Sequence, residues 1–296
     1  MLKSMKSGTR KRIAAAVAVV SAATALMVTS PGSSTAAVTA TPALMAYGIT
    51  ADGLTMASFS TATPGTLNWV MDVTGLVGDT KLVGIDHRVQ NGLMYGLGEK
   101  GGIYTITTPP TTSSVVVTKV SQLQVALYGT SFDIDFNPAA DRLRVISNNG
   151  QNLRHNLNDG TTVTDSALNL PPLTTAATGV TGAAYTNNDL VGSTGTTLTD
   201  VDTYNDQIVI QSPPNAGNLV PTGLLGFDAN LEAGYDIFST TTNGKTTANS
   251  AFAALTPYNG KASFYSVDIL TGAPTLIGTF PSVVQITDFT ITISGS

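Results

Sequence analysis

The stretch DIDFNPAADRLRVISNNGQNLRHN (133–156) contains three short runs of alternating or β-branched residues separated by two turn signals. Asn137 with Pro138 marks the first turn, and NNG (148–150) marks the second, because Asn and Gly readily adopt positive φ. Three strands in about 25 residues predict an antiparallel meander. The stretch also carries Asp133 and Asp135 two positions apart, so it is either an acidic active site or one unit of a repeating structure.

A repeat is favoured because the pattern recurs along the chain. The segment 82–107 aligns with 131–156 at a step of 49 residues, and Asp86 then lies opposite Asp135. Later units begin near 180, 233 and 284. Their residues at the same position are Ala184, Asp236 and Asp288. A period near 50 residues is typical of β-propeller blades.

The ends of the chain predict how such a ring would close. The last unit, 284–293, has only a first strand, whereas 44–61 resembles the later strands of a unit. We therefore predict an all-β, five-bladed β-propeller in which the N- and C-terminal strands share one blade, which removes exposed sheet edges. Scarce helix formers, including only two Glu, agree with an all-β chain. A β-sandwich or irregular barrel is the alternative.

The N-terminal segment has the features of a secretory signal peptide. Five basic residues precede the apolar run 13–28, and small residues follow it. We predict a signal peptide over 1–37, cleaved after Ala37 or Ala40, and a single propeller domain over 41–296. An uncut membrane anchor is the alternative, but the apolar run is short for a membrane span.

Composition excludes several classes of function. Cleavage would remove five of the 14 basic residues and none of the 19 acids, leaving a net charge of −10. This charge disfavours nucleic acid and anionic membranes as partners. The absence of cysteine excludes thiol chemistry, and two histidines are too few for a zinc site with several His ligands.

Residues 132–160, FDIDFNPAADRLRVISNNGQNLRHNLNDG, strongly resemble the signature of a secreted bacterial family catalogued as domain of unknown function four-three-nine-four. The segments 83–106, 183–189 and 211–226 are also similar to that family, and the similarity spans most of residues 44–293. The resemblance implies a propeller-like fold and export. It implies no reaction, because the family has no established one.

The repeated aspartates form the main candidate site. If each lies on the innermost strand of its blade, the carboxylates of Asp86, Asp135, Asp236 and Asp288 converge in the channel. There they would bind calcium or another hard cation through oxygen ligands, with Ala184 as a gap for water or ligand. The alternative is that each aspartate bonds neighbouring backbone amides and joins the blades together.

Other polar residues give weaker signals. Asp133 with Asp135 is a possible acid/base pair of a glycosidase, although we assign no catalytic residue. Arg142, Arg144 and Arg154 suit an anion clamp, but alternating charges on a strand more often face water or pair with acids such as Asp141. The two histidines, 87 and 155, are expected at the surface or in turns.

These observations favour a monomeric, secreted or cell-wall-associated propeller that acts as a binding or scaffold module for an unknown protein or carbohydrate. Loops on a rigid scaffold would make the contacts. The ligand-contacting candidates are the channel aspartates, Asp133 and Arg144. The alternative function is an extracellular carbohydrate-active hydrolase or lyase that uses channel-facing carboxylates.

Overall fold

The computed structural model describes residues 43–293. The predicted signal peptide, 1–37, lies outside the described residues. Within them the chain forms twenty β-strands and one 3-10 turn, η1 (Pro214–Ala216), and no α-helix. No helix of the described part is long and apolar enough to cross a membrane. The prediction of an all-β chain is therefore confirmed.

The strands form groups of four antiparallel neighbours. One group contains β20 (Ile286–Ile291), β1 (Met45–Thr50), β2 (Thr55–Ser60) and β3 (Leu67–Thr74). The next contains β4 (Leu82–Arg88), β5 (Leu93–Gly98), β6 (Gly102–Thr107) and β7 (Val115–Gln122). These two groups are joined in a single sheet only by a short parallel contact, in which Val73 and Thr74 pair with Val115 and Val116.

Three further sheets of four strands complete the domain. The first contains β8 (Phe132–Asn137), β9 (Arg142–Ser147), β10 (Asn152–His155) and β11 (Thr162–Thr164). The second contains β12 (Val180–Tyr185), β13 (Leu198–Asp202), β14 (Gln207–Gln211) and β15 (Leu219–Leu224). The third contains β16 (Ala229–Thr242), β17 (Lys245–Pro257), β18 (Ser263–Val267) and β19 (Pro274–Thr279). The meander predicted for 133–156 is confirmed as β8 to β10.

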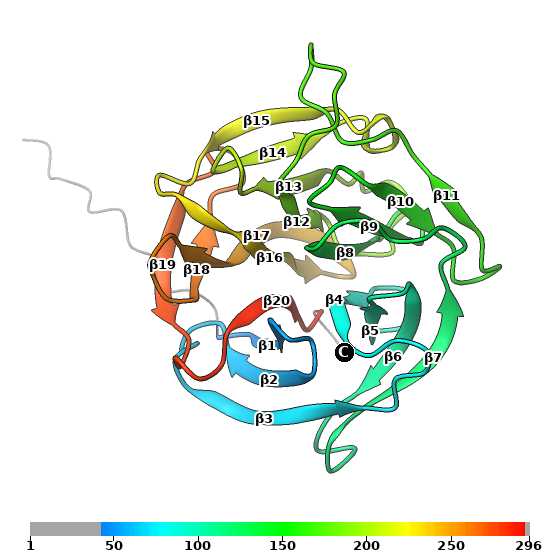
Figure 1. Ribbon diagram of the computed structural model, residues 1–296, viewed down its shortest axis with the longest axis vertical. Helices are drawn as coiled ribbons and strands as arrows, with labels where there is room; N and C mark the ends of the chain where they lie inside the picture. Colours follow the sequence, from blue (N-terminus) through cyan, green and yellow to red (C-terminus); the bar gives the residue numbers. More distant parts are fainter. Residues whose placement is uncertain (1–42, 294–296) are drawn as a thin grey trace, which may run out of the picture. The chain divides into compact units, whose positions relative to one another are not determined.

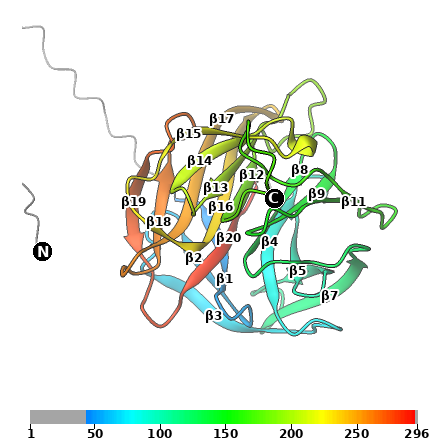
Figure 2. The same cartoon turned by 45° about the horizontal axis from the view of Figure 1, so that its top comes forward.

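The two ends of the described chain meet in one sheet. Strand β20 pairs antiparallel with β1, with Ala46 opposite Ile291 and Ile49 opposite Asp288. Figures 1 and 2 show the red C-terminal strand beside the blue N-terminal strands in both views. The order β20-β1-β2-β3 matches the prediction that the N-terminus supplies the later strands of the unit that the C-terminus begins.

The first strands of the groups surround a common centre, while β3, β7, β11, β15 and β19 lie at the periphery (Figure 1). Around this centre β20 contacts β4, β4 contacts β8, β8 contacts β12, β12 contacts β16, and β16 contacts β20. The cyclic order means that each inner strand has an inner strand on either side of it. Within the described domain, the fold is therefore propeller-like.

Apolar side chains fill the spaces between neighbouring sheets. One cluster joins the first and last groups through Phe59, Phe264 and Phe289, whose ring centroids lie 5.0–6.5 Å apart in edge or tilted contacts. Such aromatic pairs stabilise beyond the area they bury. Further clusters lie between the other sheets. Because the core consists of contacts between sheets, each sheet depends on its neighbours for burial.

Candidate functional site

The inner strands carry a ring of aspartates that bond the neighbouring strand. The backbone N–H of Phe136 donates to Asp86 Oδ2 at 2.7 Å, and that of Ile85 donates to Asp288 Oδ2 at 2.7 Å. The N–H of Ile291 donates to Asp236 Oδ2 at 2.6 Å. Each bond joins one inner strand to the next. The arrangement matches the alternative in which aspartates join the blades through backbone amides.

Strand β8 contributes two acids to this ring instead of one. The N–H of Ala183 donates to Asp133 Oδ2 at 2.8 Å, and the N–H of Tyr185 donates to Asp135 Oδ1 at 3.1 Å. Both side chains therefore point from β8 to β12, because alternate residues of a strand share a face. The spacing of two residues, which suggested an acid/base pair, instead lets both aspartates accept hydrogen bonds from the backbone of β12.

The five carboxyl groups form two sets at the centre. Asp86, Asp135 and Asp236 each place one oxygen within 4.8 Å of the others. Asp288 and Asp133 make the second set, in which the charge of Asp288 helps to raise the pKa of Asp133. All five side chains are buried. The structure thus brings together every predicted acid, but in two sets rather than in one ring of equivalent positions.

Burial makes these carboxyls unusually weak acids. Loss of solvent raises the pKa of Asp288 to about 8 and that of Asp236 to about 6. Burial, followed by the charge of a neighbouring aspartate, raises the pKa of Asp86, Asp133 and Asp135 well above the usual range. Part of the cluster therefore holds protons near neutral pH unless a cation supplies the compensating charge.

The trio of Asp86, Asp135 and Asp236 is the set that could hold a cation. Oxygen atoms 4.8 Å apart or closer can contact one calcium ion at its usual distance of about 2.4 Å. At least one oxygen of each aspartate also accepts a backbone N–H from a neighbouring strand. The same three side chains therefore serve the connection between strands whether or not an ion lies between them.

His87 belongs to this cluster, which corrects the expectation that it lies at the surface. It is on β4, is 7 % exposed, and its Nδ1 lies 2.9 Å from Thr290 Oγ1. Thr290 in turn donates to Asp86 Oδ1 at 3.3 Å. Burial lowers the pKa of His87 to about 4, so the ring is neutral at pH 7. His155 is also buried, between Ser121 and Thr162, and not in a turn.

The position of Ala184 is filled by the core and is not a gap. Ala184 is buried in an apolar cluster with Val201 and Tyr235. Beside it, a Cβ on Gly182 would lie 2.8 Å from the Cβ of Tyr235. The contact between β12 and β16 therefore depends on close apolar packing, whereas the other inner strands are joined through carboxylates.

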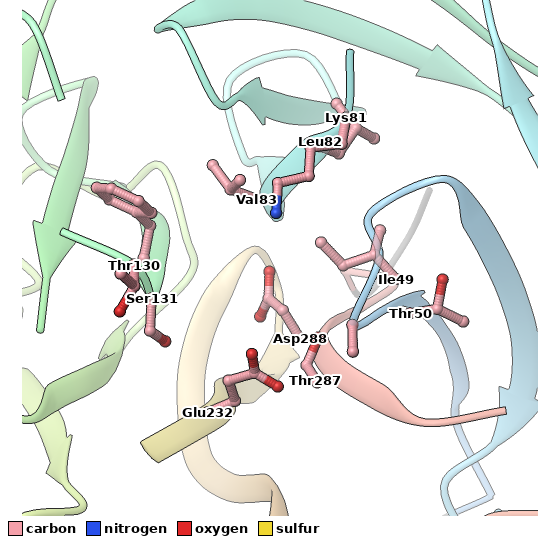
Figure 3. Close-up of a pocket in the computed structure, with 12 residues that line it drawn as sticks. Ile49, Thr50, Lys81, Leu82, Val83, Thr130, Ser131, Glu232, Thr287 and Asp288 are labelled. Atoms are coloured by element: carbon pink, nitrogen blue, oxygen red, sulfur yellow. The ribbon is translucent and has the colours of Figure 1, made fainter. Parts of the chain in front are cut away.

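One end of the centre opens into a very small cavity of ≈ 50 Å³. Figure 3 shows the carboxylates of Asp288 and Glu232 projecting into this opening, bordered by Leu82 and Val83 on one side and by Ser131 on another. A water molecule occupies about 30 Å³ in the liquid. The cavity has room for water or an ion and not for a sugar ring.

Arg144 does not lie with the channel acids. It is 1 % exposed and donates from Nη1 to Asp165 Oδ2 at 2.7 Å and from Nε to the Tyr185 hydroxyl at 3.2 Å. Arg154 binds both oxygens of Asp165. Arg144 and Arg154 therefore pair with an acid, as the alternative expected, but the acid is Asp165, whereas Asp141 pairs with Arg88.

Sequence reasoning missed the partners that bury Arg144. Besides Asp165 and Tyr185, it donates to Asn152 at 2.7 Å and to Asn215 at 2.9 Å. Asn215 lies 71 positions away in η1, so no local pattern connects the two. The sequence signal for a polar environment around Arg144 was the alternation of DRLRVIS. There Arg144 shares a strand face with Arg142 and not with Leu143 or Val145.

Comparison with protein families assigns the chain. The model of the family described as Domain of unknown function (DUF4394) matches residues 55–290, so the chain belongs to this family. Among curated proteins, no match to the chain is found.

Several solved structures resemble the chain at low identity. One is from a nidogen/laminin complex, with 10 % identity, TM-score 0.46, and coverage of 86 % of this chain and 99 % of that one. A glutaminyl cyclase from Myxococcus xanthus has 11 % identity, TM-score 0.43, and coverage of 75 % and 95 %. A protein of unknown function from Bacteroides thetaiotaomicron has 12 % identity, TM-score 0.46, and coverage of 85 % and 65 %.

Proposed function

We propose that this chain is a secreted five-bladed β-propeller that binds an extracellular protein or carbohydrate and catalyses no reaction at its centre. One observation carries the proposal. The five central aspartates are buried and direct carboxylate oxygens at backbone N–H groups of neighbouring strands. A group held in this way supports the scaffold and is poorly placed to transfer a proton to a substrate.

The count of five blades rests on the grouping of strands. Five sets of four antiparallel strands succeed one another in the described chain, and their first strands contact in cyclic order. The short parallel contact between β3 and β7 involves two residue pairs, so we assign these strands to separate blades. The pairing of β20 with β1 then closes the ring within one blade.

Export is proposed from the sequence. The basic residues before an apolar run at 13–28, followed by small residues, suit a signal peptide cleaved after Ala37 or Ala40. A chain without cysteine and with a strong negative charge after cleavage suits a monomer that is soluble outside the cell, free or at the wall. The role is that of a binding or scaffold module.

The size of the central opening argues against a hydrolase. Glycosidases need two carboxyl groups about 5–9.5 Å apart with a sugar between them. The cavity at the end of the centre is ≈ 50 Å³, which leaves no room for a sugar beside Asp288. Calcium or another hard cation between Asp86, Asp135 and Asp236 would be a structural ligand in this proposal, and not a catalytic one.

The experiment compares binding with turnover. The exported chain is incubated with a panel of cell-wall polysaccharides and secreted proteins, and both retention and product release are measured. We expect retention of at least one polymer or protein and no product. Product release that disappears in Asp135→Asn and persists in Asp72→Asn, a control at an exposed acid of β3, would show that the central carboxylates catalyse a reaction.

A further inference from the structure

A second cavity, of ≈ 240 Å³, has none of the five central acids in its lining. Strands β8, β9, β10 and β12 and the 3-10 turn η1 contribute to it. The side chains that matter for its chemistry are Arg142, Arg144, Arg154, Tyr185, Asn137 and Asn215. This cavity is about five times larger than the opening beside Asp288 but smaller than the sites of about 300 Å³ or more that hold drug-sized ligands, so it suits a small ion or a single small unit of a larger ligand.

The cavity carries more positive than negative charge. Three guanidinium groups line it, and Asp165 pairs with two of them, Arg144 and Arg154. Asp200 also interacts with Arg144, but burial raises its pKa well above the usual range and so favours its neutral form. Both oxygens of Asp165 are already bound, by Arg144 and Arg154. The remaining positive charge stands out on a chain whose overall charge is negative. Such a local field attracts anions.

Several donors around the cavity have no acceptor among residues 43–293. Arg154 uses Nε and Nη2 for Asp165 and leaves Nη1 unused. Arg142 uses Nη1 for the carbonyls of Ala140 and Asp141 and leaves Nη2 unused. The Tyr185 hydroxyl, in contrast, is already hydrogen-bonded to Arg144 Nε and to the side chain of Asn137. The unused guanidinium N–H groups are the kind of donor that binds an oxyanion.

The donors are also held in place before any ligand arrives. The side chain of Arg144 is 2 % exposed and is fixed by Tyr185, Asn152, Asp165 and Asn215. It in turn positions Asp165, which orients the guanidinium of Arg154. A preorganised site loses little conformational entropy on binding. An exposed, unconstrained arginine pair would lack this advantage.

We propose that this cavity binds the oxyanion group of an extracellular ligand, such as the carboxylate of an acidic sugar, a sulfate or a phosphate. The inference rests on the proposed binding function and names the chemical class of its ligand. Planar guanidinium groups bind carboxylates and phosphates through paired hydrogen bonds. The cavity volume limits the buried part to a single small unit, with any longer chain continuing into solvent.

The test follows the arginine side chains directly by NMR. The exported chain labelled with 15N-arginine contains four arginines, namely Arg88 and the three of the cavity. We titrate glucuronate, sulfate and phosphate, with glucose as the neutral control. We expect saturable shifts of the Nε–H signals of Arg142 and Arg154, while the signal of Arg88, which pairs with Asp141 outside the cavity, stays in place. The anion with the lowest Kd identifies the group that the cavity prefers.

Variants assign the binding to this cavity. The double variant Arg142→Gln with Arg154→Gln is expected to raise Kd by about tenfold or more, since each lost charge-assisted bond contributes at least about that factor. Lys261→Gln, which removes an exposed cation far along the chain, should leave Kd unchanged. Absence of a saturable shift with all three anions, or an unchanged Kd in the double variant, overturns the inference. Polymer retention that persists in the double variant leaves the binding function intact and places its site elsewhere.

Discussion

The weak acidity of the central carboxyls predicts that the domain loses stability as the pH rises through neutrality. Burial raises the pKa of Asp288 from 3.8 to about 8 in the folded state. An unfolded chain has lost this proton by pH 6.5, whereas the folded chain still holds it. Folding is therefore linked to proton binding, and the stabilising contribution of the proton declines until the pH exceeds 8.

The window from pH 6.5 to 8 isolates this effect. Below pH 6.5 the buried, neutral His87 acts in the opposite direction, because burial lowers its pKa from 6.5 to about 4 and unfolding lets it bind a proton. Above pH 6.5 that contribution decreases, because the imidazole of the unfolded chain becomes mostly neutral. A single proton released over this window reduces the free energy of unfolding by about 1–2 kcal/mol. The raised pKa values of Asp86, Asp133 and Asp135 act in the same direction.

Urea denaturation at closely spaced pH values measures this change. Asp288→Asn should be less stable throughout, since an amide cannot accept from both Ile85 and Phe289, but its stability should vary less between pH 6.5 and 8. Asp72→Asn, at an exposed position, should keep the wild-type slope. A wild-type stability that rises with pH, falls on chelation and recovers with calcium would refute the argument, because a cation at the trio would keep the carboxylates ionised.

Three further predictions concern packing, the buried arginine and ring closure. Gly182→Ala should reduce the free energy of unfolding by about 1–3 kcal/mol, because the new Cβ would lie 2.8 Å from the Cβ of Tyr235. Gly192→Ala is the control in the same urea assay, because no atom lies within 4 Å of the Cβ that it adds. Arg144→Met should reduce the free energy of unfolding by about 3–5 kcal/mol, since Asp165 and Asn152 lose a buried charged donor. A loss below about 1 kcal/mol would show that the hydrogen bonds of Arg144 add little to stability. Deletion of 284–296 removes β20 and exposes the edge of β1. We therefore expect aggregation, measured by light scattering, or a lower melting temperature, measured by circular dichroism. A monomer with an unchanged melting temperature would contradict closure through this strand.

The fold was predictable because the strand and turn signals that define it are local in sequence and recur in each unit. Turn residues such as Asn137 and the NNG tract define the strands of one unit, and the step of 49 residues shows that the unit recurs. The incomplete last unit indicated that the chain ends share a sheet, which the pairing of β20 with β1 bears out. Asp86, Asp135 and Asp236 were correctly placed near the centre, because a repeat carries equivalent residues to equivalent places. Asp288 was wrongly aligned with them, since it accepts from Ile85, one residue before Asp86, as Asp133 accepts from Ala183, one residue before Ala184.

What the sequence could not show is how each repeated position is used, since this depends on contacts between units. Asp86 and Asp236 bond the next strand, whereas Ala184 in the same slot packs against Tyr235, and nothing in the sequence near Ala184 signals the difference. The arginine cavity is less predictable still, because Asn215 reaches Arg144 from 71 positions away. The central acids recur and bind backbone amides, while the arginines of the cavity come from one unit only and keep unused donors. A repeated position is constrained by the architecture, so a ligand site is better sought where one unit departs from the repeat.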